Sequence, residues 1–164
     1  MTIAYVGLGA NLGDLHGTLE RALGDIGRLP GTRVLQVSGA WRSAPVGAEG
    51  PDYLNAVARI ESSLAPLALL RALLQIEQQH GRERPFRHAP RTLDLDLLLY
   101  ADRVQDDPEL ILPHPRLHQR AFVLLPLLEL DAALELPGLG RADRFLADVG
   151  DQRMERLPTP LQAK

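Results

Sequence analysis

Hydrophobic residues recur along this chain with the alternation of strands in some stretches and with helical spacing in others. Residues 2–9 are almost continuously apolar, which predicts a buried central strand. A second strand is predicted from Val34 to Trp41. In a third strand two sets alternate: Leu54, Ala56, Ala58 and Ile60, and Tyr53, Asn55, Val57 and Arg59. Because the first set matches a core, Tyr53 and Asn55 are expected to look away from it together.

Helical spacing fills the segments between these strands. Asp14 is placed to cap a helix that Pro30-Gly31 ends, and Pro66 stands in the first turn of a helix that Gly81 closes. Further predictions are a short return strand at 110–112, a mainly helical segment at 116–130 interrupted near Pro126, and a last short helix at 142–149.

The order strand, helix, strand, strand, helix, strand predicts an α+β fold. It is the ferredoxin-like split β-α-β arrangement, with a largely antiparallel sheet, helices packed on it and an extra C-terminal helical segment. The length of 164 residues predicts a single domain, 1–164. Residues 151–164 are polar and contain Pro158 and Pro160, so we expect a loosely ordered tail. Proteins with many different functions have this fold, so the fold alone does not identify the function.

The stretch from Arg91 to Tyr100 combines a regular apolar pattern with two acids. In an extended strand one face carries Leu93, Leu95, Leu97 and Leu99, and the other carries Thr92, Asp94, Asp96 and Leu98. The α-carbons of the two aspartates would lie roughly 6.5 Å apart. An apolar strand tolerates such a pair only when water or cations neutralise it. The pattern therefore fits either a solvated strand face or a site for divalent ions that bind phosphate.

Composition and charge narrow the function classes. The net charge of −3 and the pI near 5.9 argue against broad nucleic-acid binding. There is no cysteine, which excludes disulfides, thiolate chemistry and cysteine-ligated metal sites. The start lacks a basic leader and no apolar run reaches the length of a membrane span, so a cytoplasmic protein is expected. No feature of the sequence indicates an interface with another protein chain, so we expect a monomer.

Positive charge gathers in the loop before the acid strand, where Arg82, Arg84 and Arg87 lie. An acid pair for magnesium beside arginines suits a polyphosphate, with a nucleoside triphosphate as the obvious candidate. The chain has no Gly-x-x-x-x-Gly-Lys-Ser/Thr loop, which excludes a Walker-type enzyme, and Gly7 to Gly13 does not keep the dinucleotide spacing. Alternatively, these arginines simply belong to a solvated loop. His114, which lies between two prolines, is either a phosphate or metal contact or an ordinary surface histidine.

Several motifs together resemble the 6-hydroxymethyl-7,8-dihydropterin pyrophosphokinase family of folate biosynthesis. They are Ala89 to Leu99, Pro51 to Asn55, Glu77 to Arg82, Pro113 to Arg116, and Arg120 to Phe122. The resemblance runs from Tyr5 to about Leu130. It implies transfer of a pyrophosphoryl group from MgATP to the pterin hydroxymethyl oxygen, with release of AMP.

The resemblance also implies a role for individual residues. Asp94 and Asp96 would be catalytic and would bind two Mg²⁺ ions. The ATP-binding residues would be Glu77, Arg82, Arg84, Arg91, Leu97, His114, Arg116 and Arg120, with Arg82 and Arg91 also catalytic. The pterin site would comprise Ser43, Ala44, Val46, Tyr53, Asn55 and Phe122, with the two aromatic rings sandwiching the pterin and Asn55 reading its hydrogen-bonding edge. Both long loops would act as lids that exclude water.

Two features of this chain bear on that implication. Some members of the family carry Trp-Gly where this chain has His88-Ala89. Some also carry a lysine in the same loop, where this chain has only arginines and Pro85. These differences affect the expected loop closure and ATP affinity. The chain also shows no strong general base, and we expect positioning and metal charge to dominate, with Asp94 or Asp96 at most receiving the proton.

Two other classes of function are testable alternatives. A ferredoxin-like RNA-binding module would need exposed aromatic residues and a basic sheet face, whereas aromatic residues make up 4% of this chain. A metal-dependent phosphohydrolase would use the same acids and release phosphate from ATP without a pterin. A phosphohydrolase would give no functional role to Tyr53, Asn55 or Phe122.

Overall fold

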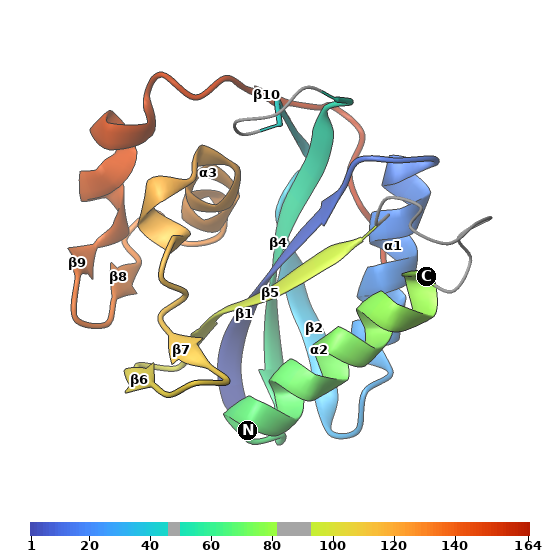
Figure 1. Cartoon of the computed structure of the whole chain (residues 1–164), viewed down its shortest axis with the longest axis vertical. Coiled ribbons are helices and arrows are strands. Elements are labelled where there is room, and N and C mark those ends of the chain that lie inside the picture. Colours follow the sequence, from blue (N-terminus) through green and yellow to red (C-terminus); the bar gives the residue numbers. More distant parts are fainter. Residues whose placement is uncertain (46–49, 82–92) are drawn as a thin grey trace.

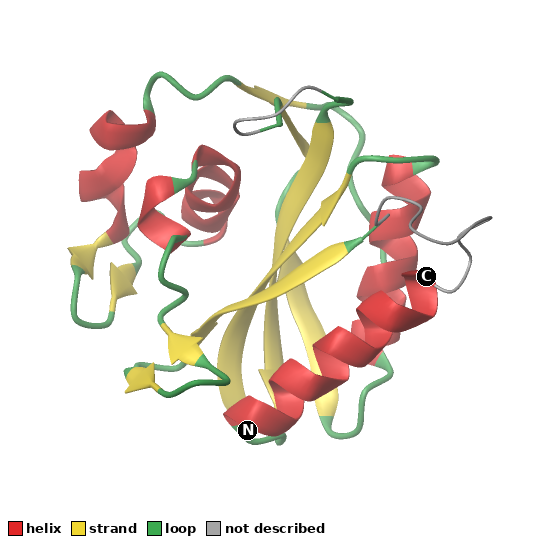
Figure 2. Cartoon of the chain, viewed as in Figure 1, coloured by secondary structure: helices red, strands yellow, loops and turns green. Residues whose placement is uncertain are grey.

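The computed structural model of the chain describes residues 1–45, 50–81 and 93–164. Within these ranges a large sheet is combined with helices and two small hairpins (Figure 1; Figure 2). The elements are β1 (Thr2–Ala10), α1 (Leu15–Gly27), β2 (Thr32–Val37), β3 (Trp41–Ser43), β4 (Tyr53–Ser62), α2 (Pro66–Gly81), β5 (Asp94–Tyr100), β6 (Gln105–Asp106), β7 (Ile111–Leu112), the 3-10 helix η1 (Leu117–Gln119), α3 (Ala121–Leu130), β8 (Glu135–Leu136), β9 (Gly140–Arg141), the 3-10 helix η2 (Ala142–Val149) and β10 (Met154–Arg156).

The large sheet has the strand order β10-β3-β4-β1-β5, and β2 pairs with the remaining length of β4. All of its pairings are antiparallel. The apolar strand β1 lies between β4 and β5, as its composition predicts. β4 lies between β1 and β2, although α1 connects those two strands directly along the chain. This is the ferredoxin-like split β-α-β arrangement, and the predicted fold class is confirmed.

The strand predicted from Val34 to Trp41 is divided in the structure. β2 pairs with the second half of β4 and β3 pairs with its beginning. Ser38 bridges the gap between them, because its N–H donates to the Val57 carbonyl and its hydroxyl accepts from the Val57 N–H, both at 2.9 Å. The interruption leaves β3 as a separate short strand whose Ser43 lies opposite Tyr53.

Helices cover the two faces of the sheet to different extents (Figure 1). α1 and α2 pack on one face and bury a continuous core with β1, β4 and β5; their fully buried residues include Leu19, Leu23, Ile26, Leu69 and Leu73. Burial of each such side chain stabilises the fold by about 1.5–3 kcal/mol. η1, α3 and η2 pack on the opposite face, over Tyr5, Val57, Leu98 and Leu99.

The remainder of this second face carries five positions that we call the polar half-face: Gly7, Gly9, Asn55, Asp94 and Asp96. Side-chain alternation places them on the same side of the sheet as Tyr5 and Val57. The strands also align them, because Gly9 pairs with both Asn55 and Asp94, and Gly7 pairs with Asp96. The polar half-face is therefore the part of the sheet available to a ligand.

β5 contains a bulge that the alternating pattern did not predict. Tyr5 pairs with Leu99 and Val6 with Leu97, so Leu98 is an extra residue with no partner on β1. The alternation restarts after it, and Leu98 and Leu99 both join the core under α3. The prediction that Leu99 shares a face with Leu95 and Leu97 is therefore wrong.

The helical predictions hold with one correction. Asp14 caps α1 by accepting from the Gly17 N–H at 3.1 Å, and α2 has the predicted ends. α3, however, runs through Pro126, and the break in the segment 116–130 lies at Arg120, between η1 and α3. Pro126 removes one backbone donor, and the full burial of Leu124 and Leu127 holds the helix in place.

The segment 151–164 is more ordered than its composition predicts. β10 pairs with β3, and the chain then runs along α1, where the Gln162 N–H donates to Glu20 Oε2 at 2.9 Å and Leu161 is 8% exposed. Gly24 permits this approach, since a Cβ there would lie 1.4 Å from the Lys164 carbonyl oxygen. In this segment pairing with residues distant in sequence supplies contacts that local propensity does not predict.

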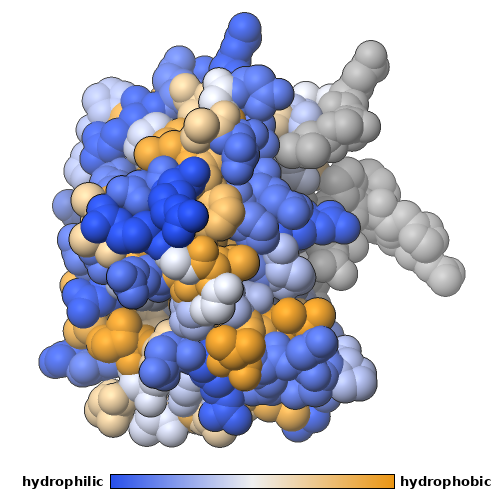
Figure 3. All heavy atoms as spheres, turned by 90° about the vertical axis from the view of Figure 1, so that its left-hand side faces the viewer, coloured by the Kyte–Doolittle hydropathy of each residue, from blue (hydrophilic) through white to orange (hydrophobic). Residues whose placement is uncertain are grey.

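None of the helices in the described residues is both long enough and apolar enough to cross a membrane. On the side of the molecule shown in Figure 3, hydrophobic residues form small patches separated by hydrophilic ones.

Candidate active site

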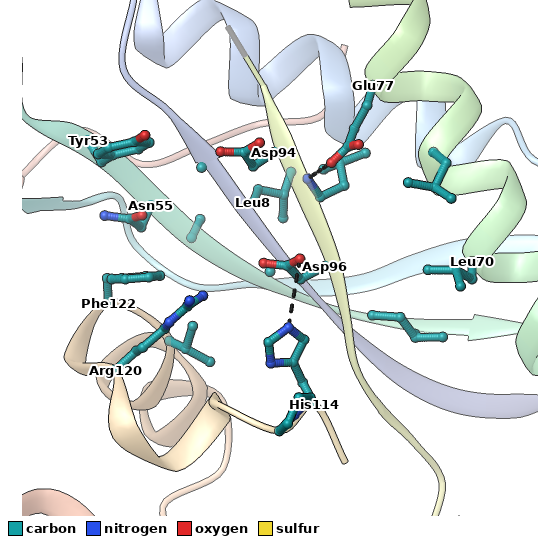
Figure 4. A pocket seen from close by; sticks show the side chains of 18 of the residues that line it. Leu8, Tyr53, Asn55, Leu70, Glu77, Asp94, Asp96, His114, Arg120 and Phe122 are labelled. Carbon is teal, nitrogen blue, oxygen red and sulfur yellow. Dashed lines mark hydrogen bonds and ion pairs between the residues drawn. The ribbon is translucent and has the colours of Figure 1, made fainter. Parts of the chain in front are cut away.

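A cavity of about 650 Å³ lies over the polar half-face, a size typical of small-molecule sites. β1, β3, β4 and β5 supply its floor, α2 and β7 line one end, and the segment that leads into α3 lines the other. Figure 4 shows the principal side chains converging on it. The structure therefore brings together residues that are far apart in sequence.

The acid pair occupies the middle of this cavity. Asp94 and Asp96 line it from β5, and the Asp96 side chain is 42% exposed there. The positions opposite them on β1 are Gly9 and Gly7, which have no side chain to fill the space in front of the carboxylates. A ligand can therefore approach both acids from the sheet face.

His114 reaches the acid pair because of the bulge in β5. The carbonyl of Leu98, left without a partner on β1, accepts the His114 N–H at 2.9 Å. This bond places His114 Nε2 4.0 Å from Asp96 Oδ1 (Figure 4). The Arg116 N–H donates to His114 Nδ1 at 3.2 Å, so in the neutral ring the proton is on Nε2 and faces the cavity.

The charge state of His114 follows from its surroundings. Burial lowers the pKa of His114 below its ordinary value, and Arg120 and Arg116 act in the same direction against the opposing effect of Asp96. At pH 7 the ring is therefore neutral in the free protein, and it offers the cavity an N–H donor rather than a positive charge.

The other end of the cavity is aromatic and carries an amide. In Figure 4 the rings of Tyr53 and Phe122 lie on either side of the Asn55 side chain. Asn55 is 4% exposed, and its Nδ2 donates to Ser43 Oγ at 2.7 Å and to the Trp41 carbonyl at 3.2 Å. Both of its N–H groups are thus bound, so its Oδ1 is the atom presented toward Gly9 and the cavity.

The third region of the cavity is apolar. Leu70 and Leu74 reach it from α2, and Pro108 to Ile111 line it from the β6–β7 connection. Arg71 donates from Nε and Nη2 to the two carboxylate oxygens of Glu109 at 2.9 and 3.1 Å, and so ties α2 to this connection. Sequence reasoning missed these lining residues; one signal was available, since in a short strand such as 110–112 one leucine or isoleucine must face outward.

Comparison with known proteins identifies the family to which this chain belongs. A family sequence profile described as 7,8-dihydro-6-hydroxymethylpterin-pyrophosphokinase (HPPK) matches residues 5–132. The chain belongs to the HPPK family. The resemblance stated from the motifs is therefore confirmed, and with it the class of enzyme, a transferase.

Relatives of this HPPK match over nearly its whole length. A 2-amino-4-hydroxy-6-hydroxymethyldihydropteridine pyrophosphokinase of Pseudomonas aeruginosa is 44% identical over 94% of this chain and 96% of its own. The enzyme of the same name from Haemophilus influenzae is 40% identical over 96% of this chain and 99% of its own.

Solved structures agree with the fold of this HPPK. An HPPK-DHPS in complex with substrates superposes with a TM-score of 0.70 over 89% of this chain at 13% identity, and a Plasmodium falciparum HPPK-DHPS with 0.73 over 92% at 13% identity. This chain spans 43% and 46% of those longer chains. At this identity the likeness shows the fold alone.

The structure gathers most of the predicted site residues of this HPPK. Those that line the cavity are Ser43, Ala44, Tyr53, Asn55, Glu77, Asp94, Asp96, Leu97, His114, Arg120 and Phe122. Arg116 is exposed, does not line the cavity, and contributes its backbone N–H to His114. Val46, Arg82, Arg84 and Arg91 lie outside the described residues. The individual roles assigned to these residues stay predictions.

The donor set fits a magnesium ion delivered with a polyphosphate. Across the described residues no group of three or more His, Cys, Asp or Glu side chains forms a complete metal cage. Two carboxylates on one strand are the kind of partial ligand set that Mg²⁺ uses when substrate phosphates and water complete its shell. This agrees with the ATP and Mg²⁺ requirement of the enzyme class.

Proposed function

We propose that this chain transfers a pyrophosphoryl group from MgATP to 6-hydroxymethyl-7,8-dihydropterin in folate biosynthesis. The pterin hydroxymethyl oxygen forms a bond to the β-phosphorus, the bond from that phosphorus to the oxygen of the α-phosphate breaks, and AMP leaves. One observation carries the proposal: a single cavity with an aromatic amide end, a pair of carboxylates in its middle, and an apolar end. These three regions match a pterin, a triphosphate and a nucleoside.

At the aromatic end the chain would bind the pterin. Tyr53 and Phe122 would stack on its two faces, and Asn55 Oδ1, fixed by Ser43, would accept a hydrogen bond from its amino and amide edge. The backbone near Ala44 and Val46 would complete this pocket. The floor offers room because Gly9 has no side chain.

In the middle of the cavity Asp94 and Asp96 would hold two Mg²⁺ ions together with the phosphates. The metal charge would stabilise the negative charge that develops on the phosphate oxygens during transfer. Arg120 and the neutral His114 would bind phosphate oxygens, joined by Arg82, Arg84 and Arg91. Glu77 and Leu97 would lie beside the nucleoside.

Acceleration would come mainly from alignment of the two substrates. The nearest candidates to take the hydroxyl proton are Asp94 and Asp96, which line the same cavity. Holding both substrates in one cavity would supply the larger contribution. We further propose that the chain acts on small molecules as a monomer; the small hydrophobic patches in Figure 3 support this for the face shown.

Phosphorus NMR of the purified protein with MgATP tests the proposal directly. With 6-hydroxymethyl-7,8-dihydropterin present we expect AMP and pterin diphosphate in equal amounts, and without the pterin we expect unchanged ATP. ADP and free phosphate in both samples would overturn the proposal in favour of a phosphohydrolase. No reaction in either sample, from a protein shown to be folded, would also contradict it.

A further inference from the structure

β5 carries both carboxylates of the acid pair and forms one edge of the large sheet. It pairs with β1 on its inner side, where Asp94 faces Gly9 and Asp96 faces Gly7. Edge strands have half of their backbone groups directed away from the sheet, and they are correspondingly easier to displace. The outer side of β5 is therefore open to a second contact that holds the strand in place.

The backbone group that lies between the aspartates has a charged partner. The Leu95 N–H donates to Glu77 Oε2 at 2.6 Å, across the outer edge of β5. Figure 4 shows the Glu77 side chain reaching from α2 to the backbone of β5. A short bond from a backbone N–H to a carboxylate is among the stronger hydrogen bonds in proteins, and Leu95 is 3% exposed, so its N–H has little access to water as a substitute.

The position of Glu77 is itself fixed. α2 is anchored in the core by Leu69, Leu73 and Ile76, which are 0%, 0% and 4% exposed. The other end of β5 is attached at the start of the same helix, because the Tyr100 hydroxyl donates to the Leu64 carbonyl at 2.7 Å. The strand of the acid pair is therefore fastened at two points, to a helix that is anchored in the core and to the turn that leads into this helix.

We propose that Glu77 is a positioning residue that sets the separation and direction of Asp94 and Asp96 by holding the Leu95 N–H. This inference rests on the proposed function, in which those carboxylates hold magnesium and the triphosphate. It gives Glu77 a task distinct from contact with the nucleoside, although its side chain also lines the cavity. The interaction acts through the backbone, so an uncharged acceptor of the same length can replace part of it.

Three variants and a control separate these tasks. Glu77→Gln keeps an oxygen acceptor at the same reach, Glu77→Asp keeps the charge but shortens the side chain, and Glu77→Ala removes the acceptor. Gln78→Ala, at the next and exposed position of α2, is the matched control. Two measurements are made: amide hydrogen exchange of Leu95 in the free protein, and calorimetric binding of MgATP and of magnesium tripolyphosphate, which has no nucleoside.

We expect Leu95 exchange to be at least about tenfold faster in Glu77→Ala and Glu77→Asp than in the wild type, the loss expected for one charge-assisted bond. Both variants should bind MgATP and magnesium tripolyphosphate more weakly by the same factor, about tenfold. Gln78→Ala should stay within about threefold of the wild type in every measurement, and Glu77→Gln should keep more of the slow exchange and of the binding than Glu77→Ala does.

Other outcomes would overturn the inference. Weaker binding of MgATP with unchanged binding of tripolyphosphate would make Glu77 a nucleoside contact, and unchanged Leu95 exchange in Glu77→Ala would show that the bond does not hold the strand. A Glu77→Gln variant as impaired as Glu77→Ala would point to charge instead of position. If the wild type binds neither ligand, the proposed function fails, while Leu95 exchange still tests the role of Glu77 separately.

Discussion

The two faces of the sheet are built from the same strands, yet consecutive residues on them have opposite tasks. On β5 Leu95 is 3% exposed beneath α1 and α2, whereas the side chain of Asp96, one position later, is 42% exposed in the cavity. On β1 the residues paired with them are Leu8 and Gly7. Side-chain alternation alone thus separates residues that hold the fold from residues that face a ligand, and substitutions at adjacent positions should separate stability from activity.

The largest expected effect comes from comparing Asp96→Asn with Leu95→Ala. Loss of one charge-stabilising group lowers kcat by about 10²- to 10³-fold, so Asp96→Asn should lose activity on that scale while its melting temperature stays within about 2 °C of the wild type. Leu95→Ala should lower the free energy of unfolding by about 2–5 kcal/mol through the cavity it leaves. Steady-state kinetics and thermal denaturation measure the two effects.

Asp102→Asn, in the exposed turn after β5, is the control for the charge change and should alter neither property. A large loss of stability in Asp96→Asn would contradict the division of tasks between the two faces.

An intermediate effect is expected when a methyl group is added to the polar half-face. A Cβ at Gly9 would lie 3.3 Å from Asn55 Oδ1, and Asn55 cannot easily move because Ser43 holds its Nδ2. Gly9→Ala should therefore weaken binding of 6-hydroxymethyl-7,8-dihydropterin about tenfold, which corresponds to about 1.4 kcal/mol. Calorimetry with a non-hydrolysable ATP analogue present measures this affinity.

Gly7→Ala is the matched control, since its Cβ would meet the Leu98 side chain at 3.4 Å, an ordinary contact, and would lie away from Asn55. Equal pterin affinities in the two variants would show that the space beside Asn55 is not what the ligand uses.

The smallest effect concerns the network that ties α3 to the strands beside the polar half-face. Glu129 accepts from the Gly39 N–H and Trp41 Nε1 and pairs with Arg156 of β10. Burial alone would raise the pKa of Glu129, but Arg156, Gly39 and Trp41 together hold it below the ordinary value. Its contribution to stability is then complete above the unfolded pKa of about 4.3 and is lost as the pH falls through the lower folded pKa.

Glu129→Gln should accordingly destabilise the protein by about 1 kcal/mol at pH 7, and the difference from the wild type should shrink as the pH falls below about 4. Urea denaturation at a series of pH values gives both quantities. A difference that is constant across this range would mean that the carboxylate charge plays no part.

Local patterns predicted much of the fold, since strands, helices and the Asp14 cap depend on residues close in sequence. The pairings that local patterns cannot reveal were missed: the bulge at Leu98, the division between β2 and β3, and β10, which pairs with residues more than a hundred positions earlier. Each of these features is fixed by the register or packing of a segment distant in sequence. Neither the periodicity of hydrophobic residues nor local secondary-structure propensity can therefore predict it.

The candidate site also combines residues that the sequence pointed to with residues that it did not. The spacing of Asp94 and Asp96 allowed either a solvated strand face or a metal site, and family motifs pointed to Tyr53, Asn55 and Phe122. The apolar end formed by Leu70, Leu74 and Ile111 was not predicted, because its parts meet only when α2 and the β6–β7 connection pack together. The bond between Ser43 and Asn55 depends likewise on β3 lying beside β4.

The extra residue in β5 makes chain length, and not only side-chain chemistry, part of the active site. Because alternation restarts after Leu98, deleting that one residue would leave Leu97, Leu99 and Tyr100 in the phase they now have. It would also remove the carbonyl that anchors the His114 backbone. A library of point substitutions would never sample this dependence, whereas removing one leucine from the run Leu97-Leu98-Leu99 would expose it.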